Sequence, residues 1–134
     1  MRTGRCLCGA VTFRAAELGA FGICHCRQCQ RWSGGPMIAV SVPQSAMEAT
    51  GPVAPRRTSG WATRARCAEC GSPLWYRWDK GIDGAGDYEV PIGLFDDANG
   101  LTVRHEIFAA EKPDSFAFAG DHPRHAGPPP REDF

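Results

Sequence analysis

The chain has 134 residues, and its 15 lysines and arginines balance 15 aspartates and glutamates, so its formal net charge is zero. A chain with this charge balance lacks the broad positive field that dominates nucleic-acid affinity. It also contains no run of roughly 18 apolar residues that could cross a membrane. The length therefore predicts one domain, located by default in the cytoplasm, with neither a nucleic-acid nor a membrane partner.

The first half of the chain is expected to hold short strands and little helix. Strands are expected at residues 10–14, 21–23 and 37–42. The first alternates between apolar and polar residues, and the last is a β-branched run that ends at Pro43. Helical segments are expected at residues 27–33 and 44–49. Gly34 and Gly35 close the first of them.

The second half is expected to continue as strands joined by turns. Further strands are expected at residues 74–78, 88–95 and 101–108. Residues 80–87 predict an exposed loop, and residues 96–100 predict a turn. The tail from His122, with prolines at 128–130, cannot form a regular sheet or helix, so a surface strap or a loose end is expected. The fold class predicted is mostly β.

Seven cysteines lie in three tight groups, which is the arrangement that thiolate coordination of zinc requires. The groups are Cys6 and Cys8; Cys24, Cys26 and Cys29; and Cys67 and Cys70. Residues separated by one position project to the same side of an extended segment, which would bring their sulfurs together. Disulfides are disfavoured because the count is odd and residues 1–4 contain no apolar export segment.

The number of cysteines also predicts two different kinds of site. Two pairs supply the four sulfurs of a closed structural site, and a group of three leaves one coordination position open. Three protein ligands plus water or substrate are typical of a catalytic zinc. Spacing alone does not decide which groups share an ion.

Three motifs, in order, resemble the glutathione-dependent formaldehyde-activating enzyme (GFA) family, which includes centromere protein V. They are Gly-Arg-Cys-Leu-Cys-Gly-Ala-Val at 4–11, Cys-His-Cys-Arg-Gln-Cys-Gln-Arg-Trp-Ser-Gly at 24–34 and Cys-Ala-Glu-Cys-Gly-Ser-Pro-Leu at 67–74. The resemblance extends over about residues 4–116. It implies a single domain, 1–134, of several coiled β-sheets around zinc sites, a fold shared with a Rab GTPase chaperone, with residues 117–134 as strap or tail.

The resemblance also implies a partition of the cysteines. Cys6, Cys8, Cys67 and Cys70 would hold a structural zinc, and Cys24, Cys26 and Cys29 would hold a second, catalytic zinc. Arg66 departs from the family, which commonly has an aromatic residue before this cysteine. Its guanidinium either offsets the charge of four thiolates or is simply solvated.

The function implied is that of a zinc-dependent carbon–sulfur lyase or synthase acting on a thiol–aldehyde adduct of the S-hydroxymethylglutathione type. Its partners would be a small thiol such as glutathione and an aldehyde such as formaldehyde. Two alternatives stay open: a zinc-scaffolded binding module, and a thiol sensor whose three-cysteine group oxidises and releases its metal.

Side chains beside the three-cysteine group each allow a functional and a structural interpretation. His25 is expected to pack or hydrogen-bond rather than to bind metal, because in an extended segment it points away from the ligands. Arg27 and Arg31 would either bind a substrate carboxylate or be solvated. Trp32 would either line a pocket or pack in the fold. Ser33 is expected to cap or turn the chain.

Overall fold

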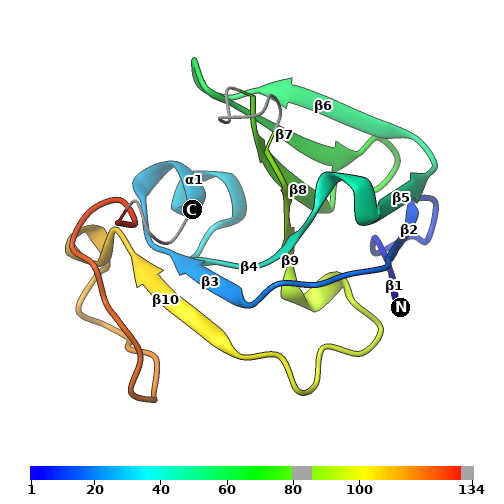
Figure 1. Cartoon of the computed structure of the whole chain (residues 1–134). Coiled ribbons are helices and arrows are strands. Elements are labelled where there is room, and N and C mark those ends of the chain that lie inside the picture. Colours follow the sequence, from blue (N-terminus) through cyan, green and yellow to red (C-terminus); the bar gives the residue numbers. More distant parts are fainter. Residues whose placement is uncertain (80–85, 131–134) are drawn as a thin grey trace.

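The computed structural model describes residues 1–79 and 86–130, whose strands form a three-stranded and a seven-stranded sheet (Figure 1). The smaller sheet has the order β1-β2-β5, with β1 at Arg2–Arg5, β2 at Thr12–Ala15 and β5 at Met47–Thr50. Both of its strand pairs are antiparallel.

The larger sheet has the order β10-β3-β4-β9-β8-β7-β6. Its strands in chain order are β3 (Phe21–Cys24), β4 (Met37–Val42), β6 (Val53–Arg57), β7 (Ala62–Cys67), β8 (Pro73–Trp78), β9 (Tyr88–Pro91) and β10 (Val103–Ile107). Neighbours are antiparallel except β10 and β3, which are parallel. The helical elements are α1 (Arg27–Ser33) and three short 3-10 helices, η1 (Gln44–Ala46), η2 (Ile92–Leu94) and η3 (Ala109–Glu111).

The mostly-β prediction is confirmed, and the helix at 27–33 and the strand at 37–42 have the predicted bounds. Two predicted segments change type part-way. The expected strand at 88–95 becomes the helix η2 after Pro91, and the expected helical turn at 44–49 becomes strand β5 at Met47. Strands β1, β6 and β7 were not predicted; in β7, arginines interrupt the apolar pattern. Most of the predicted loop at 80–87 lies outside the described residues.

The hydrophobic core lies between the small sheet and one face of the large sheet. Phe13 and Ala15 of β2 pack there against Val40 and Val42 of β4 and Val90 of β9. The rings of Phe13 and Phe95 meet edge to face at 5.3 Å. These side chains form the contiguous interior that a chain of this length can build from short elements.

The opposite face of the large sheet carries polar side chains, because successive residues in a strand point to opposite faces. Tyr76 lies beside Arg64 on one neighbouring strand and beside Glu89 on the other, and Glu89 lies beside Ser41. Helix α1 lies on this side of the molecule, between the β10–β3–β4 end and the β6–β7 hairpin (Figure 1). This face therefore positions the candidate site.

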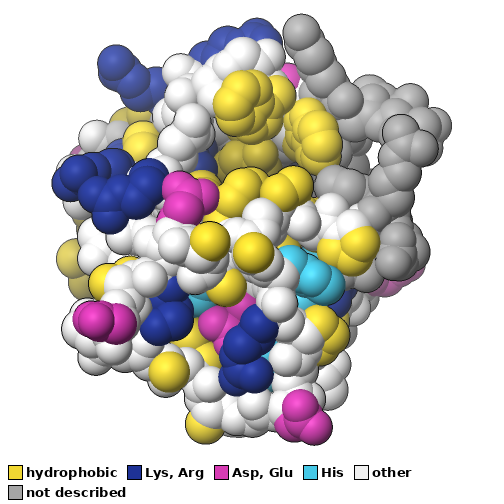
Figure 2. Space-filling model, turned by 90° about the vertical axis from the view of Figure 1, so that its left-hand side faces the viewer, with side chains coloured by type: hydrophobic (Ala, Val, Ile, Leu, Met, Phe, Trp, Pro, Cys, Tyr) yellow, Lys and Arg dark blue, Asp and Glu magenta, His cyan; other side chains and the backbone are white. Residues whose placement is uncertain are grey.

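The tail packs along β10. Glu106 accepts a backbone hydrogen bond from His125 and donates one to Pro123, and Phe108 donates one to Gly127. Glu106 and Arg124 form an isolated parallel bridge. On this side of the molecule, basic, acidic and hydrophobic side chains are interspersed among the described residues in view (Figure 2). None of the described helices is long and apolar enough to span a membrane.

Candidate functional site

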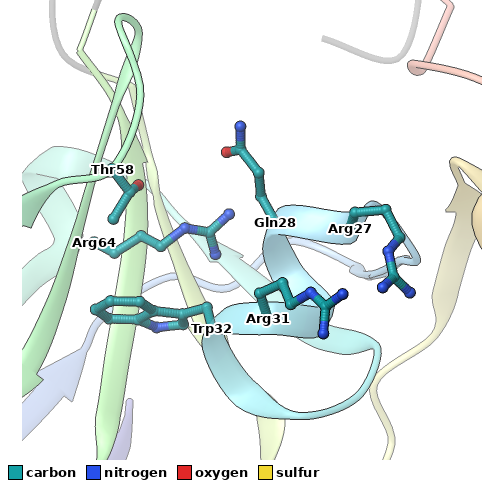
Figure 3. Close-up of a pocket in the computed structure, with 6 residues that line it drawn as sticks. All are labelled: Arg27, Gln28, Arg31, Trp32, Thr58 and Arg64. Carbon is teal, nitrogen blue, oxygen red and sulfur yellow. The ribbon is translucent and has the colours of Figure 1, made fainter.

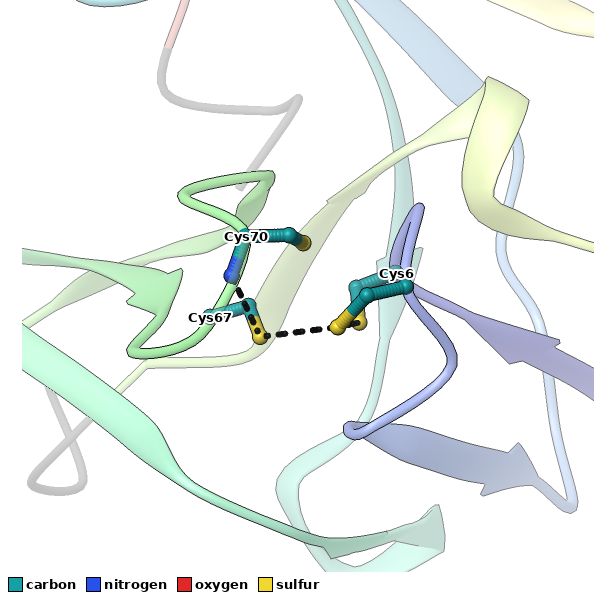
Figure 4. A group of neighbouring side chains, drawn as sticks. Cys6, Cys67 and Cys70 are labelled. Atoms are coloured by element: carbon teal, nitrogen blue, oxygen red, sulfur yellow. Dashed lines mark hydrogen bonds between the residues drawn. The ribbon is translucent and has the colours of Figure 1, made fainter.

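The first cysteine group consists of Cys6, Cys8, Cys67 and Cys70, brought together from the β1–β2 and β7–β8 connections (Figure 4). All four sulfurs lie within 4.8 Å of one another. Cys8 Sγ is 3.6 Å from Cys6 Sγ and 3.8 Å from Cys67 Sγ. A zinc–sulfur distance of about 2.3 Å places tetrahedral ligands about 3.8 Å apart, so these donors fit a closed four-sulfur metal site.

Both connections achieve this with a tight turn. In each turn a glycine with positive φ, Gly9 at 79° and Gly71 at 78°, donates its N–H to the carbonyl of Cys6 or Cys67, three or four residues back. Backbone N–H groups point at the sulfurs, as in Val11 N to Cys6 Sγ at 3.4 Å. The expectation that Cys6 and Cys8 meet through extended backbone is wrong: a turn, not strand alternation, brings their sulfurs together.

The second group, Cys24, Cys26 and Cys29, is local. Cys24 ends β3, Cys26 caps the N-terminus of α1, and Cys29 lies in the helix. Cys26 Sγ accepts a hydrogen bond from Cys29 N at 3.4 Å, which is how an N-cap side chain satisfies a free helical N–H. The three sulfurs also lie within 4.8 Å of one another, so this group can hold a metal ion with three protein ligands.

Hydrogen bonds among these three thiols separate their pKa values. Those with Cys24 and Cys29 lower the pKa of Cys26 to about 2, and those with Cys26 and Cys29 raise the pKa of Cys24. Because thiolate is the metal-binding form, the protons that these thiols carry would leave as a metal binds.

A guanidinium lies beside the three-cysteine group. Arg64, on β7, is 2% exposed, and its Nη2 is 3.5 Å from Cys29 Sγ. Its Cζ lies 4.9 Å from the ring centre of Tyr76 and 5.9 Å from that of Trp32. Burial, above all, raises the pKa of Tyr76 to about 12, so this phenol stays protonated at neutral pH. Three thiolates and a divalent cation carry one negative charge, which Arg64 can offset.

Sequence reasoning did not find Arg64, nor the buried polar network behind His25. Glu106 is 1% exposed and receives three side chains: His25 Nε2 at 2.7 Å, His122 Nε2 at 2.6 Å and Arg124 Nε at 2.8 Å. Burial raises the pKa of Glu106, but the hydrogen bonds from His122 and His25 outweigh it and leave the pKa below its ordinary value. The predicted hydrogen-bonding role of His25 is thus confirmed.

The network fixes the direction of His25, whose ring packs near Phe116 and Phe118 at 6.0 and 5.8 Å. Since the two neighbours of His25 are Cys24 and Cys26, the tail of the chain helps to position the three-cysteine segment. The sequence gives little signal for this network, because the partners of Glu106 are 16 to 81 positions away.

The remaining predicted neighbours take different places. Arg27 and Arg31 are exposed on α1, and Arg27 Nη1 donates to Gln30 Oε1 at 2.9 Å. Trp32 is half-buried between two arginines. Ser33 ends α1 and donates to the carbonyls of Cys29 at 3.0 Å and of Gly35, beyond the C-cap Gly34, at 3.3 Å, in line with its predicted role in turning the chain.

Arg66 joins the two cysteine groups. Its guanidinium lies 3.9 Å from the ring centre of Trp32 and donates to the carbonyls of Trp32 and Gly71 at 2.6 and 2.8 Å. The side chain is half-buried, and both terminal nitrogens of its guanidinium donate to backbone oxygens, so it is not simply solvated. It therefore links the β7–β8 turn of the closed group to the helix that carries Cys29.

A cavity of about 330 Å³ adjoins the three-cysteine group, between α1 and the β6–β7 hairpin (Figure 3). It is lined by Arg27, Gln28, Arg31, Trp32, Thr58 and Arg64. Three of these six residues carry a positive charge and none carries a negative one. The cavity therefore suits an anionic group on a small molecule.

Comparisons with known proteins agree with this architecture. Residues 1–111 match the family model described as glutathione-dependent formaldehyde-activating enzyme. An uncharacterized lyase of Schizosaccharomyces pombe is 29% identical over 118 residues, which are 87% of this chain and 84% of the relative. A crystal structure of a Rhodobacter sphaeroides protein aligns with a TM-score of 0.58 and 20% identity, over 75% of this chain and 97% of that chain. The last similarity concerns the fold alone.

Proposed function

Because the chain belongs to the glutathione-dependent formaldehyde-activating enzyme family, we propose that it is a zinc-dependent carbon–sulfur lyase or synthase. It would join a thiol such as glutathione to an aldehyde such as formaldehyde, and would catalyse the reverse cleavage. The observation that carries this proposal is the group of three cysteine sulfurs, Cys24, Cys26 and Cys29, which leaves a fourth metal position for a substrate. The reducing cytoplasm, where such thiols stay free, is the proposed compartment.

The roles proposed for the cysteines follow from their surroundings. Cys24, Cys26 and Cys29 would hold the catalytic zinc beside Arg64 and the cavity, and Cys6, Cys8, Cys67 and Cys70 would hold a structural zinc. When bound, zinc at the open group would lower the pKa of the substrate thiol and keep its sulfur in place.

The reaction itself needs no oxidant or reductant. The substrate sulfur forms a bond to the carbonyl carbon, the carbon–oxygen π bond breaks, and the thiol proton ends on the new hydroxyl oxygen. The chain's contribution is to bring the two reactants together: Arg64 offsets negative charge at the sulfurs, and the network of His25 and Glu106 keeps the cysteine segment in place. Loss of any of these groups should therefore slow the reaction through positioning.

The proposal is tested with cobalt in place of zinc, because cobalt–thiolate absorption reports a change in the coordination sphere. Adding glutathione should change the spectrum of the wild type, and adding formaldehyde as well should give the hydroxymethyl adduct faster than in buffer. Cys29→Ser should lose both effects. Glu48→Gln, an exposed change in the small sheet, is the matched control and should keep both.

Two outcomes would contradict the proposed reaction. A spectrum that responds to no cellular thiol, together with no acceleration, would favour a zinc-scaffolded binding module. Reversible oxidation of Cys24, Cys26 and Cys29 with loss of metal, again without acceleration, would favour the thiol sensor.

A further inference from the structure

We propose that the cavity containing Arg64 and Thr58 is a subsite for a carboxylate group of the thiol substrate. This inference rests on the proposed function, which places the substrate sulfur at Cys24, Cys26 and Cys29. It adds a specificity determinant: the protein should select thiols that carry a carboxylate, and Arg64 should be the residue that reads it.

Arg64 is a buried cation whose hydrogen-bonding capacity is largely unused. A guanidinium has five N–H donors, and the hydrogen bonds of Arg64 in the described part of the chain go to two sulfurs, Cys29 Sγ at 3.5 Å and Met37 Sδ at 3.9 Å. No carboxylate among residues 1–79 and 86–130 forms an ion pair with it. Buried charges are normally paired, and the two sulfurs use only part of this guanidinium, so its remaining N–H groups are available to an anion in the cavity.

Thr58 provides an independent observation in the same cavity. Its hydroxyl oxygen is buried and has no hydrogen-bond partner among the described residues, although its backbone N–H bonds to Ala62 O at 3.2 Å. A buried hydroxyl without a partner costs free energy unless a ligand or water satisfies it. Thr58 and Arg64 both line the space between the hairpin and α1 (Figure 3).

The positive charge around the cavity matches a carboxylate better than a neutral group. Trp32 forms one wall, and exposed Arg27 and Arg31 carry further positive charge on α1 (Figure 3). A planar guanidinium can bind both oxygens of a carboxylate, and a threonine hydroxyl can donate a further hydrogen bond.

Neutralising the cysteine group explains only part of this arrangement. That role accounts for the contact of Arg64 Nη2 with Cys29, but it accounts neither for the remaining donors nor for the hydroxyl of Thr58. The same guanidinium thus lies between the cysteine sulfurs and the cavity. A thiol held at the sulfurs would place a nearby carboxylate within its reach.

Calorimetry with S-methylglutathione and its diethyl ester tests the subsite, because the methyl group removes the thiol and so separates carboxylate recognition from thiolate coordination. The wild type should bind the acid at least about tenfold more tightly than the ester. Arg64→Gln should bind the acid more weakly by roughly that factor, and its affinity for the ester should be unchanged. Arg56→Gln, an exposed arginine of the same hairpin outside the cavity, is the matched control and should change neither affinity.

Equal affinity of the wild type for acid and ester, or no binding of the acid, would overturn the inference, whatever the variants do. An equal loss of affinity for the acid and the ester in Arg64→Gln would overturn the inference as well. If this variant fails to fold, Thr58→Val takes its place and should lose about threefold for the acid alone. Discrimination without accelerated adduct formation would keep the subsite and refute the proposed reaction, and the converse would refute only the subsite.

Discussion

Two acids in the large sheet show how single residues depend on their partners. Glu106 is surrounded by three donors, and they keep it ionised. Glu89 is also largely enclosed but has the hydroxyl of Ser41, at 2.8 and 3.0 Å, as its hydrogen-bond donor. Burial, partly offset by Ser41 and Arg104, therefore raises the pKa of Glu89 to about 7.

This raised pKa predicts a pH-dependent cost at Glu89. The folded state binds the proton more tightly than the unfolded state, whose carboxyl has its ordinary pKa of 4.5. The contribution of Glu89 to the free energy of unfolding is thus fully present below pH 4.5 and is lost as the pH rises through about 7. Glu89→Gln should therefore be more stable than the wild type at pH 8, by up to ~3 kcal/mol, and similar to it below pH 4.5.

Urea denaturation at several pH values from 4 to 8 measures this difference, and titration of the cysteines cancels because both proteins carry all seven. Glu48→Gln is the control: Glu48 is exposed, and 4.0 Å separates it from Arg14, so its effect should stay within about 0.5 kcal/mol at every pH. A Glu89→Gln difference that does not vary with pH would contradict the assignment.

At the scale of elements, the two cysteine groups differ in what they connect. The closed group joins the β1–β2 turn, which carries Cys8, to the β7–β8 turn, which begins at Cys67. These two cysteines are 59 positions apart in the sequence. The open group lies within one β3–α1 segment. A metal in the closed group crosslinks two sheets, whereas a metal in the open group adds no long-range connection.

Cys70→Ser should consequently destabilise the protein more than Cys29→Ser. Loss of a crosslinking metal ligand should cost about 3 kcal/mol or more, which lowers the Tm of a chain of this size by roughly 10 °C. Cys29→Ser should cost less than half of that and leave a folded protein. Thermal unfolding under reducing conditions measures both. Equal Tm values for Cys70→Ser and the wild type would show that the closed group is not a structural metal site.

For the whole molecule, the core and the candidate site occupy opposite faces of one sheet. The small sheet covers the apolar face, and α1 covers the polar face near Cys24. Arg66 joins the two cysteine groups across this arrangement. The single domain of residues 1–134, with a core of about 4–116, stays a prediction.

Metal content should reflect the two kinds of site. The purified protein should bind close to two equivalents of zinc, and a chelator should remove the metal of the open group first because three ligands hold it instead of four. Elemental analysis during a chelator titration, with Cys29→Ser as the one-site reference, gives the order of release. Seven freely titratable thiols in native protein without zinc would contradict both sites.

The sequence by itself determined the features that depend on neighbouring residues. Cysteine spacing predicted sulfur groups, the β-branched run at 37–42 predicted a strand, and Gly34 marked the end of the helix at 27–33. Such features follow from backbone geometry over a few positions. The spacing also indicated an open group of three cysteines, since Cys24, Cys26 and Cys29 lie within six residues.

The tertiary structure alone decided which residues far apart in the chain lie together. It pairs Cys6 and Cys8 with Cys67 and Cys70, a partition that only family resemblance had implied. It also places Arg64 beside Cys29, 35 positions away, and Glu106 beside His25, 81 positions away. These contacts depend on the strand order of the large sheet, in which β10 lies beside β3 and β7 lies near the other edge, and local propensity does not encode strand order.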